Sequence, residues 1–447
     1  MAMIKVAQCS DLHYSVKNLD EADRCFGFAV DEAIRRGVDL AIVSGDSTDH
    51  ALDVHCPAVE RLARQVRRLA DHCPVLMLQG TYSHEPPGTL SIFPLLGGRY
   101  PVHVADRISQ VALIDGGSWV VSDGWRFDAV PAGAQALLTC VPTVNKANVA
   151  AAVGAAEAAE AVGAEIGALL AGYASINAAA RQAMVPTIGV SHGTVTGCVT
   201  EHGVPMAGMD HEFTTTGLFA AGAQAFMLGH IHKHQHWDDG GRVIAYAGSI
   251  GRFHHGEPDA KGFLLWEVGA AVTRLELVET PARRTVDLVF EGAPDVDAIT
   301  KAVKEQGLAG AHVRVRWSIG EEDRAQVDRD AIQRALGEAA HVQLEGRVIP
   351  VVRSRADGIS RAGSLAEKVA LWARVAAVDA GPLTARLGQL DEFEPAQVVS
   401  SILAGQDGHA REVDGSTGQD EGAGSVVAEV AQESDAAQGR FETVDMF

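Results

Sequence analysis

The chain has 447 residues, of which 47% are hydrophobic and 21% charged, a composition typical of a soluble globular enzyme with two or three domains. Its formal net charge of −21 argues against a broad nucleic-acid-coating surface, because phosphate binding depends on clustered Lys and Arg. Any nucleic-acid contact must therefore be local to a cleft, bridged by metal ions or supplied by a partner.

The sequence shows no sign of a membrane or an oxidising environment. No apolar run approaches the ~18 residues of a membrane span, and the first residues lead into a strand rather than a signal peptide. We therefore expect a cytoplasmic protein with no membrane partner. The six cysteines contain no CxxC pair, so we interpret them as reduced, mostly structural thiols.

Polar side chains follow the first two predicted strands. The strand at residues 4–9 leads into Asp11 and His13, a carboxylate and an imidazole that suit a metal with mixed oxygen and nitrogen ligands. A helix over residues 19–36 separates it from a second strand that ends at Asp46. Strand, helix and strand imply a parallel crossover, which brings Asp11 and Asp46 side by side. Asp46 is therefore a candidate to bridge two ions.

The third predicted strand, over residues 74–79, is also followed by polar side chains. It comes after a helix around residues 57–70 and ends in a polar stretch that contains His84 and Glu85. Asp49, just after the second strand, either orients a ligand from behind or serves as a turn or helix cap. Three consecutive strands thus deliver Asp, His and Glu to the same edge of a sheet.

Two later strands each end in a small residue followed by histidine. Residues 187–190 lead to His192, and residues 225–228 lead through Gly229 to His230 and His232. Side chains two residues apart on an extended backbone point to the same face. The intervening segments are predicted as short strands (101–141), one or two packed helices (147–184) and, after His232, antiparallel strands of a second sheet (243–250 and 261–266).

Beyond about residue 281 the pattern changes to a small α+β domain. Amphipathic segments follow at residues 364–377 and 395–404, and the rest of the chain is too rich in Gly, Gln, Ser and acidic residues to order itself. The predicted domains are residues 1–280, 281–360, 361–404 and an acidic tail, 405–447.

Taken together, these histidines and aspartates match the chemistry of phosphate ester hydrolysis. Two divalent ions can activate water, orient a scissile phosphate and neutralise its charge, while a nearby imidazole protonates the leaving oxygen. We assign that imidazole to His84, with Glu85 as an orienting neighbour. The set contains no cysteine, so it does not resemble a closed structural zinc site, and manganese, iron and zinc all fit. The candidate metal ligands are Asp11, His13, Asp46, His192, His230 and His232.

The ordered motifs Asp-Leu-His, Gly-Asp-Ser-Thr-Asp, Gly80 to Glu85, Ser-His-Gly and Gly-His-Ile-His resemble the calcineurin-like metallophosphoesterase superfamily over about residues 3–270. The stretches at 246–250 and 261–263 are similar to its DNA-repair exonuclease branch, the SbcD-type nuclease subunit. The resemblance implies a four-layer α/β sandwich of two mixed sheets flanked by helices. It also implies a two-metal site usually served by manganese, and cleavage of DNA phosphodiesters.

The resemblance further implies a role for each segment. Asp11, His13, Asp46 and His232 would hold one ion, and Asp46, His192 and His230 the other. The domain from residue 281 would cap the DNA cleft. The helices after residue 364 would dock on an SbcC-type coiled-coil ATPase, whose basic surface would offset the chain's acidity.

One departure from the family pattern affects the second ion. The family has Asn, a ligand of that ion, directly before the catalytic histidine, whereas here Ser83 precedes His84 and three residues separate it from Gly80. Either Ser83 supplies a hydroxyl ligand, or a water replaces the amide, or this ion is loosely bound.

Other readings of the chain remain open. A stand-alone phosphoesterase acting on a small molecule is the enzymatic alternative, and a scaffold with a decayed site is the non-enzymatic one. A homodimer is a further candidate assembly. The last residues resemble the bacterial sliding-clamp peptide, which makes a clamp a candidate partner through Val444, Asp445, Met446 and Phe447.

Overall fold

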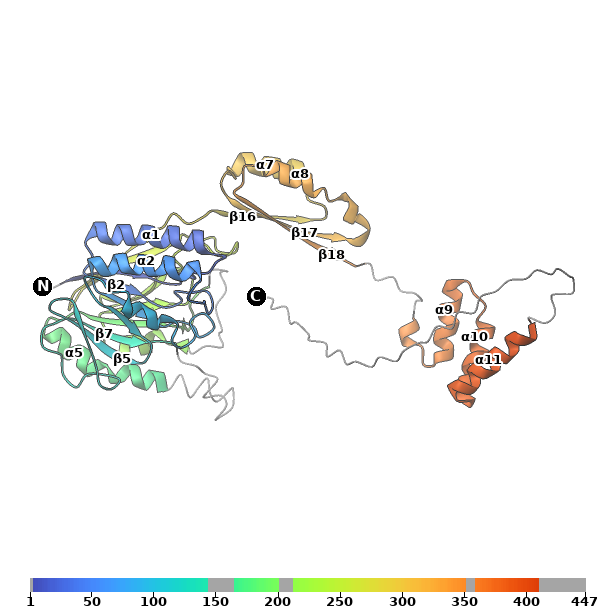
Figure 1. Cartoon of the computed structure of the whole chain (residues 1–447), viewed down its shortest axis with the longest axis horizontal. Helices are drawn as coiled ribbons and strands as arrows, with labels where there is room; N and C mark the ends of the chain where they lie inside the picture. The colour runs from blue at the N-terminus through green and yellow to red at the C-terminus, as the bar shows by residue number, and fades with distance from the viewer. Residues whose placement is uncertain (1–2, 144–164, 201–211, 351–357, 410–447) are drawn as a thin grey trace, which may run out of the picture. The chain divides into compact units, whose positions relative to one another are not determined.

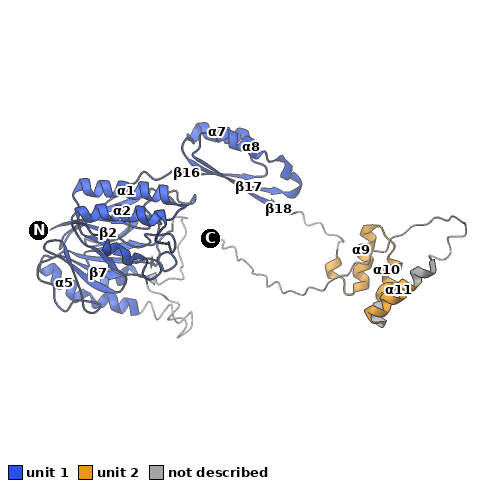
Figure 2. Cartoon of the chain, in the orientation of Figure 1, with its two compact units in different colours: residues 1–351 blue, residues 352–447 orange. Residues whose placement is uncertain are grey.

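The computed structural model describes residues 3–143, 165–200, 212–350 and 358–409 (Figure 1). The chain divides into two compact units, residues 1–351 and 352–447 (Figure 2). Within the described residues, no helix is both long and apolar enough to cross a membrane. The six cysteines are free thiols, and all but Cys56 are buried.

The first sheet carries the strands that were predicted to end in Asp11, Asp46 and His84. Four parallel strands lie side by side in chain order, and two antiparallel strands extend the sheet beyond the first of them. The order is β15 (Thr273–Glu279), β14 (Gly262–Val268), β1 (Ile4–Cys9), β2 (Leu40–Val43), β3 (Val75–Leu78) and β4 (Val102–Ala105), with α1 (Leu19–Arg36) and α2 (Pro57–His72) as the crossovers.

Helix α1 begins and ends at the predicted residues. Its buried residues include those at positions 22, 26, 29 and 33, which share one helical face because they are three or four residues apart. Gly37 ends the helix with a φ of 64°, a left-handed conformation that glycine adopts without steric cost. The chain then turns directly into β2, which keeps β1 and β2 adjacent.

The second sheet carries the strands that end in His192 and His230. Its four central strands are parallel, with antiparallel neighbours at both edges. The order is β12 (Gln235–Asp239), β13 (Arg242–Tyr246), β11 (Ala225–Gly229), β8 (Thr187–His192), β7 (Ala134–Val141), β5 (Ser109–Ile114) and β6 (Ser118–Val121). The short strands β9 (Thr194–Val195) and β10 (Glu212–Phe213) form a separate pair.

One prediction about these strands was wrong. The segments at 243–250 and 261–266 do not pair as neighbours in one sheet. Strand β13 lies parallel to β11 in the second sheet, whereas β14 lies antiparallel to β1 in the first. The segment between them crosses from one sheet to the other, and its length permits either arrangement. This crossing segment contains Glu257 and Lys261, which contact His232.

Apolar cores separate four layers of secondary structure. Phe26 and Met77 lie in the core between α1, α2 and the first sheet, and Leu76 and Met227 lie in the core between the two sheets. Tyr173 packs on the outer face of the second sheet, where residues 165–172, α5 (Ala174–Gln182) and α6 (Thr215–Ala220) form the last layer. Full burial of each large apolar side chain contributes about 1.5–3 kcal/mol. The predicted four-layer α/β sandwich is confirmed.

A third, smaller sheet occupies the region predicted as a capping domain. Its strands β16 (Thr285–Glu291), β17 (His312–Gly320) and β18 (His341–Ile349) are all parallel, with α7 (Val296–Gln306) and α8 (Arg329–Ala335) in the connections. We expected an α+β arrangement. A helix in each connection reverses the chain between strands and so makes neighbouring strands parallel. Short 3₁₀ turns, η1 (Thr89–Leu95) and η2 (Glu321–Gln326), lie elsewhere in this unit.

The second unit consists of helices. After the 3₁₀ turn η3 (Ile359–Arg361), helix α9 (Leu365–Ala376) is capped by Ser364 and Glu367 in a capping box. Helix α10 (Ala380–Glu392), which the sequence analysis missed, follows, and α11 (Pro395–His409) runs five residues past the predicted end at 404. The boundaries of the capping and docking domains stay predictions. The tail from residue 410, including the clamp-like peptide, lies outside the described residues.

Candidate metal centre

The predicted ligands meet where the carboxyl ends of both sheets face each other. Asp11, His13 and Asp46 follow β1 and β2, while His192 ends β8 and His230 follows β11. Between the sheets, the buried Gln8 side chain donates from Nε2 to Ser44 Oγ (3.1 Å) and to the Leu228 carbonyl (2.9 Å). Three groups of side chains come close enough to share ions: Asp11, His13, His232; His13, Asp46, His84; and Asp46, His192, His230.

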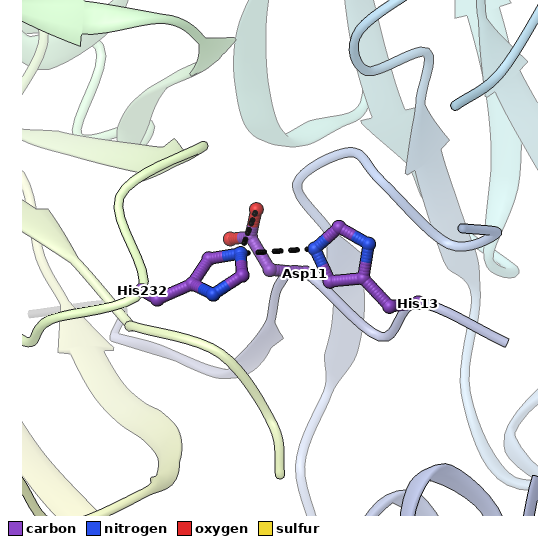
Figure 3. A group of neighbouring side chains, drawn as sticks. All are labelled: Asp11, His13 and His232. Carbon is purple, nitrogen blue, oxygen red and sulfur yellow. Dashed lines mark hydrogen bonds and ion pairs between the residues drawn. The ribbon is translucent and has the colours of Figure 1, made fainter. Parts of the chain in front are cut away.

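The first group surrounds a space bounded by two imidazole nitrogens (Figure 3). His13 Nε2 lies 2.9 Å from His232 Nε2, which is 4.0 Å from Asp11 Oδ1. His232 Nδ1 lies 2.8 Å from a carboxylate oxygen of Glu257, and since that oxygen only accepts, Nδ1 carries the proton. His232 Nε2 is therefore the ring atom that faces His13. A cation fits between such groups, because adjacent ligands on bonds of about 2.1 Å are about 3 Å apart.

Glu257 is a site residue that the sequence analysis missed. It is fully buried, and besides His232 it accepts a hydrogen bond from the Phe253 backbone (3.0 Å) and pairs with the buried Lys261 ammonium (3.3 Å). Burial alone would raise the pKa of Glu257, but His232 and Lys261 lower it. Lys261 also donates to the His232 carbonyl (2.9 Å). Glu257 and Lys261 come from the segment that crosses between the sheets, so only the tertiary fold brings them to His232.

The third group consists of Asp46, His192 and His230. His192 Nε2 lies 3.2 Å from Asp46 Oδ2, and His192 Nδ1 donates to the Ser44 carbonyl at 2.8 Å, so Nε2 is the ring atom that faces the carboxylate. Burial would lower the pKa of His192, but the negative Asp46 raises it to about 10. In the absence of a metal ion, a proton is thus the positive charge that this pair of groups demands. His230 completes the group, with its ring centroid 5.3 Å from that of His192.

Asp46 belongs to both sides of the centre. It lies within ligand-sharing distance of His13 and His84 in one direction and of His192 and His230 in the other. Burial would raise the pKa of this carboxyl, but the surrounding histidines hold it well below its usual range. His84 Nδ1 and His192 Nε2 both approach Asp46 Oδ2, at 2.9 and 3.2 Å, so this carboxylate is a candidate bridging ligand between the two groups.

The backbone is strained at the ligands themselves. Asp11, His13 and Asp46 have φ values of 51°, 45° and 50°, and His230 has a φ of 103°. Residues other than glycine rarely adopt a backbone conformation with positive φ. Such conformations cost about 1–3 kcal/mol each and persist where the surroundings enforce them. Here the backbone amide of His230 donates to both oxygens of Asp11 at 3.1 Å. Strain at four candidate ligands is consistent with a site shaped for function.

His84 also reaches the centre despite its longer loop. Its Nδ1 lies 2.9 Å from Asp46 Oδ2, its ring makes an edge contact with His13, and its side chain is one-third exposed. Burial lowers the pKa of His84, but the Asp46 carboxylate more than compensates and the pKa is raised. Thr48 Oγ1 donates to the His84 carbonyl at 2.8 Å and fixes the loop.

The two carboxylates expected behind the ligands take different positions. Glu85 is fully buried and accepts from the backbone amides of Ser47 (2.5 Å) and Gly80 (2.6 Å), so it ties together the ends of β2 and β3. Burial and the nearby Asp46 charge raise the pKa of Glu85 to about 7. Asp49 lies 3.5 Å from His13 Nδ1, and this contact lowers the pKa of Asp49 to about 2.

Ser83 does not join the other predicted ligands. Its side chain is exposed, and the contacts that the structure describes at Asp46 and His192 come instead from Thr81. Thr81 directly follows Gly80, as the family Asn does, and that adjacency was the sequence signal for it. Residues 82 and 83 form the extra turn, which the amides of His84 and Glu85 close by donating to the Thr81 carbonyl.

Comparisons with known proteins identify similar folds only. No family model matches the chain, and no curated protein sequence does. Similar solved structures include GAP50, the anchor in the inner membrane complex of Plasmodium (11% identity, TM-score 0.41, 63% of this chain and 86% of that chain). Another is a dimetal phosphatase from Danio rerio (10% identity, TM-score 0.36, 61% of this chain and 98% of that chain). A third is a predicted phosphoesterase from Streptococcus pneumoniae (10% identity, TM-score 0.24, 62% of this chain and 99% of that chain). At these identities and TM-scores, the similarity supports no conclusion about activity.

Proposed function

We propose that this protein is a two-metal-dependent DNA phosphodiesterase, a nuclease subunit that acts in repair or recombination with an SbcC-type ATPase. The observation that carries the proposal is the position of Asp46, a buried carboxylate within reach of His13 and His84 on one side and His192 and His230 on the other. Divalent cations there, manganese in our proposal and iron or zinc as alternatives, would activate water and neutralise a phosphate.

The chain's own residues divide the remaining work. His84 binds Asp46 through Nδ1, which leaves Nε2 as the ring atom that can protonate the leaving oxygen. Its partial exposure gives a substrate access to that atom. Asp49 orients His13, and Glu85 holds the loops that carry Asp46 and His84. These contacts position the acid and the ligands before any substrate arrives.

The smaller sheet supports a DNA substrate over a small phosphoester. Val313, Val315 and Trp317 of β17 face the helices, so the alternate residues Arg314 and Arg316 lie on the opposite face of the sheet. Both arginines pair with Asp287, at 2.6 and 2.9 Å. Arg316, whose side chain is 44% exposed, is the arginine of this face that a polyanion could reach, and a small-molecule enzyme has little need of such an added domain.

The helical unit supports a protein partner. Several large apolar side chains on α9 and α11 are exposed, including Leu365 (62%), Val375 (60%) and Leu403 (58%). Exposed large apolar side chains gathered on a small helical unit are what an interaction surface for a protein partner would supply. We propose that residues 364–404 dock on the coiled coil of the ATPase, and that homodimerisation and sliding-clamp binding are secondary interactions.

The test is an assay of metal-stripped full-length protein with added Mn²⁺. Labelled linear and hairpin DNA should be cleaved, while His84→Gln and Asp46→Ala should abolish cleavage with circular dichroism unchanged. His236→Gln, which changes an exposed imidazole on β12, is the matched control and should retain activity. Turnover of bis-p-nitrophenyl phosphate without DNA cleavage, even with the ATPase present, would refute the nuclease assignment and favour a stand-alone phosphodiesterase.

A further inference from the structure

Thr81 Oγ1 lies where ligands of the second ion converge. It is 3.2 Å from Asp46 Oδ2 and 3.3 Å from His192 Nε2, and these two atoms are 3.2 Å apart. On bonds of about 2.1 Å, adjacent ligands are separated by about 3.0 Å in octahedral and about 3.4 Å in tetrahedral geometry. The three atoms therefore form a triangle with the dimensions of one face of a coordination shell.

The backbone fixes this hydroxyl in place. The Thr81 amide donates to Asp46 Oδ1 at 2.7 Å, and the Thr81 carbonyl accepts from two amides of the following turn. Gly80 presses against the same carboxylate, because a Cβ there would lie 2.2 Å from both Asp46 N and Oδ1. Thr81 is thus held by the end of β3, whereas Ser83 lies on the exposed part of the turn.

The two sides of the centre differ in charge. Asp11 belongs only to the group with His13 and His232, whereas Asp46 belongs both to a group with His13 and to the group with His192 and His230. If Asp46 bridges two ions, the first ion would be held by two carboxylates and the second by one. A threonine hydroxyl is a neutral oxygen ligand of the kind that holds Mg²⁺ in phosphate-binding loops. Because the number of charged ligands tunes the affinity of a cation site, the second side should bind more weakly.

We propose that Thr81 Oγ1 is a ligand of the ion shared by Asp46, His192 and His230, and that this ion binds after, and more weakly than, the ion at Asp11, His13 and His232. The inference rests on the proposed two-metal function. The Thr81 hydroxyl would then occupy the ligand position for which the sequence suggested Ser83 or a water molecule.

The experiment is a Mn²⁺ titration of metal-stripped full-length protein, followed by isothermal calorimetry and by the electron paramagnetic resonance signal of free Mn²⁺. Wild type should show a tight and a weak class of site. Thr81→Val should weaken Mn²⁺ binding at the weak class of site by tenfold or more. Loss of a group that only orients a ligand typically weakens metal binding 10–100-fold, so loss of a ligand should weaken it at least as much. Thr81→Ser should retain both classes, and Thr300→Val, a threonine on α7, is the matched control.

Each outcome separates the alternatives. Weakening of the weak class alone supports Thr81 as a ligand, whereas equal weakening of both classes shows that Thr81 only orients the shared Asp46 and overturns the proposal. Weakening by Ser83→Ala but not by Thr81→Val also overturns it. If wild-type protein binds no Mn²⁺ at all, the two-metal function itself fails, which distinguishes that failure from a wrong assignment of Thr81.

Discussion

Replacement of Glu257 by Gln tests whether the buried carboxylate behind His232 builds the metal centre. The two oxygens of Glu257 serve three donors: His232 Nδ1, the Phe253 amide and Lys261 Nζ. Gln has one carbonyl oxygen and an amide that itself donates, so at least one donor loses its acceptor. Lys261, which is fully buried, is left with an uncompensated charge.

The expected size of the effect follows from that burial. Removing one member of a buried ion pair costs about 3–5 kcal/mol, because the remaining charge has no water and no partner. Loss of an outer partner of a ligating histidine weakens metal binding about 10–100-fold, which corresponds to about 1.4–2.8 kcal/mol. His232 and Lys261 lower the pKa of Glu257 in the folded protein, so its contribution is present above the unfolded pKa of 4.5 and is measured in full at neutral pH.

Urea unfolding of the metal-free protein and Mn²⁺ titration measure the two effects separately. Glu279→Gln, which changes an exposed carboxylate on β15, is the control and should alter neither. The double variant Glu257→Leu with Lys261→Met should regain most of the stability, because apolar residues replace a buried pair at little cost. It should not regain Mn²⁺ affinity, because His232 still lacks its acceptor. Recovery of both stability and affinity in the double variant would refute the role of Glu257.

Three further predictions concern other parts of the structure. Gly229→Ala should lower the free energy of unfolding in urea by several kcal/mol, since its Cβ would lie 2.2 Å from both Ser10 Oγ and the Ser44 carbonyl; only a mild loss would argue against so tight a contact between the sheets. Burial and the Arg314 charge lower the pKa of His255 to about 4, so its contribution to stability is present above pH 6.5 and declines as the pH falls from 6.5 to 4. His255→Gln should flatten that part of the pH profile of unfolding, and an unchanged profile would contradict it. Mn²⁺ at 100 times the Kd of a site should stabilise wild type by about 2.7 kcal/mol per site in thermal unfolding and should stabilise Asp46→Ala less, whereas equal stabilisation of both would place the ions away from Asp46.

The strand ends were predictable because each step of that inference is local. An apolar run followed by a small residue and then Asp or His predicts a strand with a ligand at its carboxyl end, and the parallel crossovers bring those ends together. The structure accordingly places Asp11, His13, Asp46, His192, His230 and His232 in one centre, although their roles as ligands stay predictions. Helix α1 was predicted to the residue because apolar spacing and Gly37 both mark its limits.

What the sequence could not supply were contacts between distant segments. Glu257 meets His232 only because the chain crosses between the sheets after β13, and the spacing of the flanking strands fits a hairpin equally well. Ser83 was considered as a ligand because it directly precedes His84, yet its side chain is exposed. Helix α10 was missed, although its proline, Pro382, lies in the first turn, where a helix tolerates it.

The two sheets contribute to the centre in equal measure, three candidate ligands each, and this has a consequence for the sandwich as a whole. The spacing between two bound ions would depend on how the layers stack, and therefore on the apolar core between the sheets. A volume change at Leu76 or Met227, which lie in that core, should shift one set of three candidate ligands relative to the other. Bound ions would in turn hold the layers together, so metal loading should slow amide hydrogen exchange in both sheets at once.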